Sequence, residues 1–166
     1  MLHDTREQEC YTDAASDPRW PEAIKSDYSS LKTHRTFTHV KHYDRKPITC
    51  KWVFKIKINA DVSNRYKARL VARGFEQVPR LDYGKTFAPV ARLTTFRIFV
   101  PLALELHGTI HHLDVVMAFL NPTIDEETAI AIPEGIEWLD LILAQDLIQV
   151  SALQLNKALY GLKQAL

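Results

Sequence analysis

The chain has 166 residues, of which 46% are hydrophobic and 25% charged, and its formal net charge at pH 7 is +1. This length and composition suit one globular domain, or one and a half small ones. They argue against a transmembrane helix, because no apolar run approaches the roughly 20 residues that one needs. They also argue against a disulfide frame or a zinc site, because Cys10 and Cys50 stand alone.

The charges are segregated along the chain. Residues 1–40 carry 5 Lys or Arg against 7 Asp or Glu, residues 41–97 carry 14 against 4, and residues 98–166 carry 2 against 9. An excess of cations confined to the middle third indicates a surface that binds a polyanion.

The N-terminal segment 1–16 has no apolar period, so we expect a disordered leader. It lacks the basic start and apolar centre of a secretory signal, which favours a cytoplasmic or nuclear protein with reduced cysteines. A helix is expected next, because Asp17 can cap it and Pro18 suits its first position. Its buried face is predicted from the spacing of Trp20, Ile24, Tyr28 and Leu31. Residues 36–40 alternate as a short strand.

The most regular pattern in the chain covers residues 51–73. Apolar positions (Trp52, Phe54, Ile56, Ile58; then Tyr66, Ala68, Leu70, Ala72) alternate with a second set (Lys51, Val53, Lys55, Lys57; then Lys67, Arg69, Val71, Arg73). This period of two predicts an antiparallel hairpin with one apolar and one cationic face. Like charges on paired strands repel, so the face is either simply solvated or holds anions. The near absence of interleaved acids favours phosphate binding.

The second half of the chain predicts one helix and several strands. The helix covers about 93–107 and contains Pro101, which should cost roughly 3 kcal/mol or force a kink. Residues 109–120 are expected to form a buried strand, and residues 128–132 and 146–155 further strands. The order of elements predicts an α+β fold without βαβ units.

Asp114 is the one carboxylate within the apolar run 109–120. Out of water it needs a counter-charge, a metal or several donors. Beside a basic hairpin it suits metal-assisted phosphoryl transfer, but two Mg²⁺ ions need several carboxylates. The alternative is a strand-end carboxylate bonded to backbone amides. His111 and His112 would point to opposite faces of a strand and cannot chelate one ion. A hydrolase is disfavoured, because no nucleophile, base and acid converge in the sequence.

Six motifs carry a family resemblance. They are "KWVFKIK", "RYKARLVARGFEQ", "DYGKTFAPVAR", "LDVVMAFLN", "PEGI" and "KALYGLKQA". In this order and spacing they resemble the reverse transcriptase of copia-type (LTR) retrotransposons, from about Asp17 to the C-terminus. The resemblance implies the fingers and partial palm of a right-hand polymerase, with a fingers-like subdomain at 17–100 and a partial palm at 101–166.

The resemblance also implies an activity and residue roles. The activity is RNA-directed DNA synthesis with Mg²⁺, a template-primer and deoxynucleotide triphosphates as partners. Asp114 and the carbonyl of Val115 would bind the metal, with Asp114 as the catalytic carboxylate. The nucleotide would meet Lys67, Arg69, Phe119 and Gly161, and the template would meet Lys55, Lys57 and Arg73.

The sequence departs from the family pattern at several points. The "YxDD" pair of acids, the thumb and the RNase H portion have no counterpart before Leu166, so we expect a truncated fragment that is inactive alone. Arg80 and Pro122 each stand where the family usually has glycine. Two alternatives remain: a non-catalytic nucleic-acid-binding remnant that uses the basic hairpin, and a relic that folds poorly and exposes apolar patches.

Overall fold

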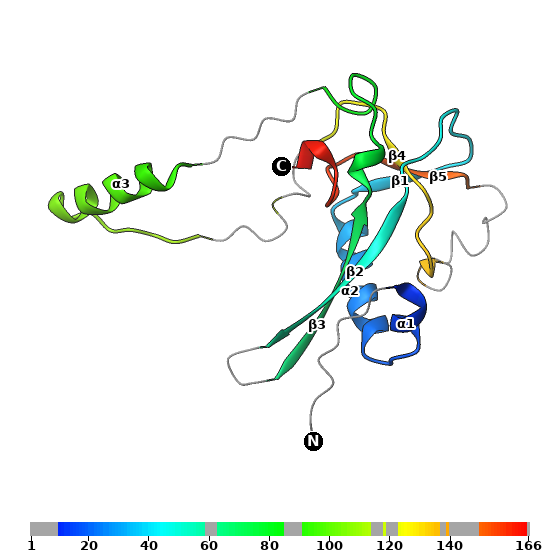
Figure 1. Ribbon diagram of the computed structural model, residues 1–166, viewed down its shortest axis with the longest axis horizontal. Helices are drawn as coiled ribbons and strands as arrows, with labels where there is room; N and C mark the ends of the chain where they lie inside the picture. Colours follow the sequence, from blue (N-terminus) through cyan, green and yellow to red (C-terminus); the bar gives the residue numbers. More distant parts are fainter. Residues whose placement is uncertain are drawn as a thin grey trace.

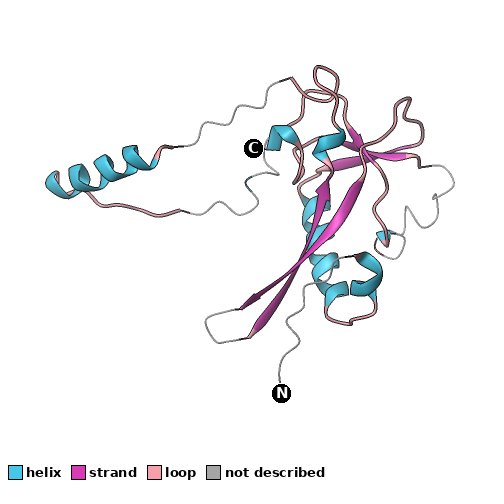
Figure 2. Ribbon diagram, in the orientation of Figure 1, coloured by secondary structure: helices cyan, strands magenta, loops and turns pink. Residues whose placement is uncertain are grey.

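The computed structural model describes residues 10–58, 63–84, 91–113, 118, 123–136, 139 and 150–165. Helices and antiparallel strands are mixed (Figure 1, Figure 2), which confirms the α+β class. The described elements are α1 (Tyr11–Ala15), α2 (Trp20–Thr33), β1 (Phe37–Val40), β2 (Cys50–Ile58), β3 (Asn64–Ala72), η1 (Gly74–Glu76), α3 (Leu93–Glu105), β4 (Ala129–Ile130), β5 (Ala152–Leu155) and η4 (Lys163–Ala165).

Helix α2 buries the face that its apolar spacing predicts. Trp20, Ile24, Tyr28 and Leu31 are each at most 2% exposed. One polar residue, Asp27, shares this buried face. Because α2 packs on β3, the helix covers one side of the β2–β3 ribbon.

Strands β2 and β3 form a two-stranded antiparallel ribbon. The register pairs Cys50 with Ala72 at one end and Ile58 with Asn64 at the other. Burial alternates along β2, with Trp52 and Phe54 buried and the lysines between them exposed. The ribbon is therefore two-faced, with its apolar side turned towards α2.

A second sheet has the strand order β1-β5-β4 and is antiparallel throughout. Phe37 pairs with Leu155, and Ile130 pairs with Leu153. The strand expected over 128–132 is shorter in the structure, where β4 holds two residues; in the described part of 146–155, from residue 150 on, β5 holds four.

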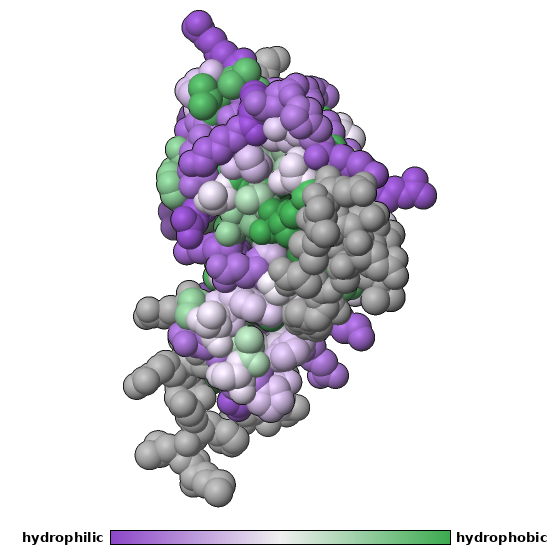
Figure 3. All heavy atoms as spheres, turned by 90° about the vertical axis from the view of Figure 1, so that its right-hand side faces the viewer, coloured by the Kyte–Doolittle hydropathy of each residue, from purple (hydrophilic) through white to green (hydrophobic). Residues whose placement is uncertain are grey.

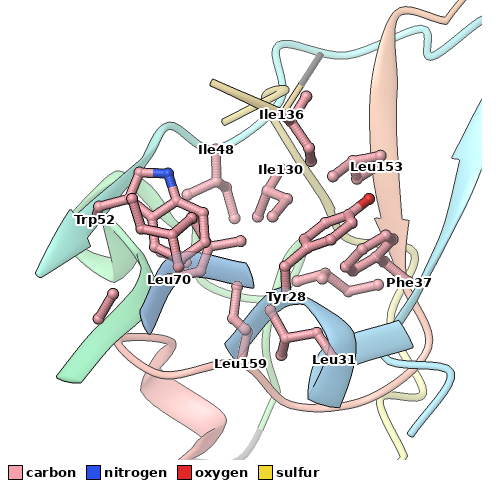
Figure 4. Close-up of a cluster of buried hydrophobic side chains, with 14 of the residues drawn as sticks. Tyr28, Leu31, Phe37, Ile48, Trp52, Leu70, Ile130, Ile136, Leu153 and Leu159 are labelled. Carbon is pink, nitrogen blue, oxygen red and sulfur yellow. The ribbon is translucent and has the colours of Figure 1, made fainter. Parts of the chain in front are cut away.

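One hydrophobic core joins α2 to both sheets. Figure 4 shows side chains from these elements converging, and the described members include Tyr28, Leu31, Phe37, Ile48, Trp52, Leu70, Ile130, Ile136, Leu153 and Leu159. Trp20 meets Phe54 and Tyr66 edge-on, with ring centroids 5.1 and 4.9 Å away. Edge-to-face pairs of this kind add about 0.5–1.5 kcal/mol each beyond area burial. On the side turned to the right in Figure 1, hydrophilic side chains predominate and the apolar ones gather centrally (Figure 3).

Two expectations from the sequence are corrected here. The disordered leader is wrong for residues 11–15, which form α1 with Ala14 fully buried. The buried strand is wrong for residues 109–113, which have no regular structure and are exposed; Leu113 is 85% exposed.

Helix α3 forms where the sequence predicts it and continues through Pro101. It buries none of its residues, and Figure 1 shows it apart from the two sheets. Phe96, Phe99 and Leu104 are each more than half exposed. In the described parts of the chain, no helix has both the length and the apolar character that a bilayer crossing needs.

Candidate nucleic-acid interface

The exposed side of the β2–β3 ribbon carries a set of cations that we call the cationic face. It consists of Lys51, Lys55, Lys57, Arg65, Lys67 and Arg69. These residues alternate with the buried apolar positions, so period two places them together. Neither strand contains an Asp or Glu that could neutralise them.

The register brings like charges directly opposite one another. Lys55 pairs with Lys67, and Lys57 pairs with Arg65. Burial, together with the charges of Arg65, Lys57 and Arg69, lowers the pKa of Lys67. Opposed cations destabilise a strand pair by up to about 1 kcal/mol. Phosphates bound to the cationic face would therefore relieve this repulsion and stabilise the strand pair.

A buried carboxylate of α2 contacts the ribbon. Asp27 of α2 is 9% exposed, and its Oδ2 accepts a hydrogen bond from the Leu70 N–H at 3.0 Å. Burial raises the pKa of Asp27 to about 6, against the lowering effects of this bond and of Arg69. Asp27 therefore lies at the edge of β3 that does not pair with β2.

The segment 157–165 lies against the end of β3. The Ala72 N–H donates to the Tyr160 carbonyl at 2.8 Å, and the Arg69 guanidinium carbon lies 5.1 Å from the Tyr160 ring centroid. Gly161 has φ +88°, and a Cβ there would overlap the Ala72 carbonyl oxygen. Packing alone thus requires glycine at this position.

A buried amide fixes the same segment from the other side. The Gln77 side chain is 4% exposed; its Oε1 accepts the Lys163 N–H at 2.7 Å, and its Nε2 donates to Gln164 Oε1 at 2.7 Å. Gln164 Nε2 donates to the Asp82 carbonyl at 2.9 Å. Asp82 in turn pairs with Arg45 at 2.9 Å. We call Gln77, Asp82 and Gln164 the amide junction.

The structure brings together part of the predicted site. Lys55, Lys57, Lys67 and Arg69 share the cationic face. Arg73 is exposed just past the end of β3, where its N–H donates to the Thr49 carbonyl at 2.8 Å. Gly161 lies in the segment against the end of β3, and the remaining predicted positions, Asp114, Val115 and Phe119, lie outside the described residues.

No group of three His, Cys, Asp or Glu side chains that could hold a metal occurs within the described ranges. His111 and His112 are both exposed. The described donor set therefore does not itself provide a magnesium site.

Sequence reasoning missed three features of the interface: the bond of Asp27 to β3, the contact of Tyr160 with Arg69, and the amide junction. Asp27 could have been noticed, because it falls on the buried stripe of α2. Tyr160, Gln77 and Gln164 lie within quoted motifs, but nothing local shows that residues 87 positions apart are bonded.

Comparison with known proteins decides the family. The family model described as reverse transcriptase (RNA-dependent DNA polymerase) matches residues 34–166. The chain belongs to this reverse transcriptase family. The match covers the cationic face and the segment 157–165, and it confirms the family indicated by the motifs.

Several proteins similar to this reverse transcriptase chain are transposon polyproteins. The chain is 38% identical over 170 residues to the retrovirus-related Pol polyprotein from transposon TNT 1-94 of Nicotiana tabacum, covering 99% of this chain and 12% of the relative. It is 39% identical over 155 residues to the retrovirus-related Pol polyprotein from transposon RE2 of Arabidopsis thaliana, covering 92% of this chain and 10% of the relative. The transposon Ty1-NL2 Gag-Pol polyprotein of Saccharomyces cerevisiae is 32% identical over 153 residues, covering 89% of this chain and 8% of the relative.

The chain spans about a tenth of the length of these relatives. No solved structure matches it.

Proposed function

We propose that this chain supplies the phosphate-holding part of an RNA-directed DNA polymerase, and that the cationic face contacts the template-primer and the incoming nucleotide. One observation carries the proposal: cations on the outer face of the ribbon, exposed except for the half-buried Lys67, are paired across β2 and β3 without an acid between them. A surface of this kind attracts phosphate regardless of base sequence. The family match and two relatives that are retrovirus-related Pol polyproteins from transposons support a role in nucleic-acid synthesis.

Within this proposal the residues have separate roles. Lys67 and Arg69 on β3 meet the triphosphate, and Lys55 and Lys57 on β2 meet the template strand, with Arg73 extending that contact. Arginine can hold two phosphate oxygens at once, whereas lysine acts as a point charge. These roles assume that the chain forms the fingers and part of the palm of a right-hand polymerase.

We propose the remaining roles from the family resemblance alone. Asp114 and the Val115 carbonyl ligate Mg²⁺, Phe119 excludes a ribose 2′-hydroxyl, and Gly161 lies under the nascent base pair. Magnesium would stabilise the charges that develop on the attacking and leaving oxygens. Further carboxylates must complete such a centre, because hard cations need several oxygen ligands.

The test compares two charge-reversed proteins. The first changes Lys55, Lys57, Lys67 and Arg69 to Glu. The second makes the same change at four exposed cations elsewhere: Lys25, Lys46, Arg92 and Arg97. Both variants have the same net charge, so a difference between them reports the location of the contact.

Binding is measured by fluorescence anisotropy with a labelled RNA–DNA hybrid. We expect the first variant to bind at least about tenfold more weakly than the second at low salt. Asp114→Asn should bind as the unaltered protein does in the absence of Mg²⁺. Equal weakening by the two charge reversals would contradict the proposal.

A further inference from the structure

Among the described cations of the cationic face, Arg69 is the one whose charged group lies over an aromatic ring. Its guanidinium carbon is 5.1 Å from the centroid of Tyr160. Arg69 pairs across the ribbon with Val53, whereas Lys55 and Lys57 face other cations. Arg69 therefore has a different environment from its neighbours, provided by a segment remote in sequence.

The backbone of that segment is fixed beside the ring. The Tyr160 carbonyl accepts the Ala72 N–H, and the flanking residues Leu159 and Leu162 are buried. Gly161 and Gly74 pack so closely that a Cβ on Gly74 would overlap the Gly161 carbonyl oxygen. The backbone that carries the Tyr160 ring is thus held by β3 and by the turn after it.

The amide junction fixes the residues that follow. Gln77 bonds both to the Lys163 N–H and to the Gln164 side chain, and Lys163 Nζ donates to the Tyr83 hydroxyl at 3.0 Å. Buried amides with all these partners hold one geometry, because leaving any of them unpaired is costly. The backbone on both sides of the Tyr160 ring is consequently anchored to the fold.

A guanidinium that lies over an aromatic ring can keep its N–H edges available. Stacking uses the flat face of the group, whereas phosphate binding uses donors in its plane. A free arginine side chain must lose rotamer freedom when it binds, and the ring removes part of that loss beforehand.

We propose that Tyr160 is a positioning residue for phosphate binding: its ring holds the Arg69 guanidinium with its in-plane donors directed at a nucleic-acid phosphate. This inference rests on the proposed function, since it needs the cationic face to bind phosphate. It adds a residue outside the ribbon to that surface and assigns it a role through Arg69.

The test uses the full chain and a fluorescein-labelled oligothymidylate of about 20 nucleotides. Tyr160→Leu removes the ring, Tyr160→Phe retains it, and Arg69→Lys retains the charge without the flat group. We expect Tyr160→Leu and Arg69→Lys each to weaken binding about three- to fivefold, and Tyr160→Phe to stay within about twofold. The double variant Tyr160→Leu/Arg69→Lys should bind no more weakly than the weaker single variant, because both changes remove the same contact.

The outcomes separate the two proposals. If Arg69→Ala weakens binding while Tyr160→Leu does not, the positioning role is wrong and the phosphate-binding face stands. If Arg69→Ala has no effect, the phosphate contact itself fails at this residue. Multiplicative effects in the double variant would show that Tyr160 acts on binding without Arg69, which would also overturn the inference.

A second measurement covers the case in which Tyr160→Leu does not fold. The Arg69 Nε–Hε resonance, assigned by its loss in Arg69→Lys, should be shifted by the ring current of Tyr160 and should move when oligothymidylate is added. It should behave identically in Tyr160→Phe. A resonance that has the usual chemical shift of an arginine Nε–Hε group, and does not move when the oligonucleotide is added, would contradict the positioning role.

Discussion

The carboxylate of Asp27 caps the backbone of the strand beside it, because its Oδ2 accepts the Leu70 N–H at 3.0 Å. Leu70 lies on β3, which pairs with β2 along one edge only. Unpaired N–H groups on the other edge could recruit a second chain, and a side chain that satisfies one of them lowers that risk. Asp27 thus joins α2 to the ribbon that bears the cationic face.

The first prediction concerns the pH dependence of Asp27. Burial raises the pKa of Asp27 to about 6 in the folded chain, above its ordinary value of 3.8. The folded state therefore binds a proton more tightly than the unfolded state, and stability falls as pH rises through this window. We expect Asp27→Asn, which keeps an acceptor for Leu70 but no charge, to be more stable at pH 7 by up to about 3 kcal/mol.

Urea denaturation of both proteins from pH 3.5 to 7.5 measures this difference. The difference in free energy of unfolding between the unaltered protein and Asp27→Asn should vanish below about pH 4, where Asp27 becomes protonated in the folded and the unfolded state alike. Asp27→Leu is the control: it removes the charge and also leaves the Leu70 N–H unpaired, which costs about 1–3 kcal/mol. Parallel stability curves for the unaltered protein and Asp27→Asn would rule out a buried, titrating carboxyl.

Glu76 should show the opposite pH dependence. Its carboxylate accepts hydrogen bonds from Thr49 Oγ1 at 2.6 Å and from the Thr49 N–H at 2.8 Å, and these bonds lower the pKa of Glu76. Stability from this group is present above its ordinary pKa and is lost as pH falls. We expect Glu76→Gln to lose about 1 kcal/mol at pH 7, and the loss to shrink as the pH falls below the ordinary pKa of a glutamate. The same denaturation series tests it, and a loss of equal size at pH 7.5 and pH 3.5 would contradict the prediction.

Arg80 stands at a position suited to glycine. Its φ is +65°, and its N–H donates to the Tyr83 carbonyl at 2.9 Å, so the turn holds it in the left-handed region. An L side chain there is strained by about 1 kcal/mol or more. We expect Arg80→Gly to raise the free energy of unfolding by about 0.5–1 kcal/mol, while Arg80→Ala should change it little. Equal thermal midpoints for the Gly and Ala variants would show that the turn relaxes.

Gly161 should tolerate no side chain. Its φ of +88° disfavours one, and a Cβ would overlap the Ala72 carbonyl oxygen. We expect Gly161→Ala to destabilise the fold by about 3 kcal/mol, through strain and overpacking. Gly84→Ala is the matched control, because its Cβ would meet only the end of the Glu126 side chain, at 3.3 Å. Thermal melts of the two variants should differ clearly, and similar midpoints would refute the packing argument.

Elements with a strong period could be predicted from the sequence. In α2 the spacing of Trp20, Ile24 and Leu31 specified both the helix and its buried face. In β2 the alternation of Trp52 and Phe54 with lysines specified the two faces. Period is informative in such cases because one side of the element packs on the core while the other remains in water.

Elements that depend on tertiary contacts could not be predicted. Helix α1 has only five residues and no period, and it is held by packing, with Ala14 buried. In residues 109–113 an apolar run indicated a strand, but apolar character alone does not provide a pairing partner. Helix α3 formed as predicted, yet helix formation is local and gave no information about burial.

The part of the site that follows from the alternation within the two strands could be predicted. The part that depends on contacts between distant segments could not. Lys55 and Lys67 could be assigned to one face, because alternation and pairing determine both positions. The contact of Tyr160 with Arg69 could not, because it joins segments that are distant in sequence. The roles of Asp114, Val115 and Phe119 stay predictions from the family resemblance.

The salt dependence of nucleic-acid binding tests the central claim, that the cationic face holds phosphate, most directly. The measurement compares the unaltered chain with Lys55→Gln/Lys67→Gln, using single-stranded oligothymidylate from about 50 to 200 mM salt. If the paired lysines contact phosphates, the slope of log K against log salt should become shallower by about 1.4, since each lost contact removes about 0.7. Identical slopes for the two proteins would contradict the claim.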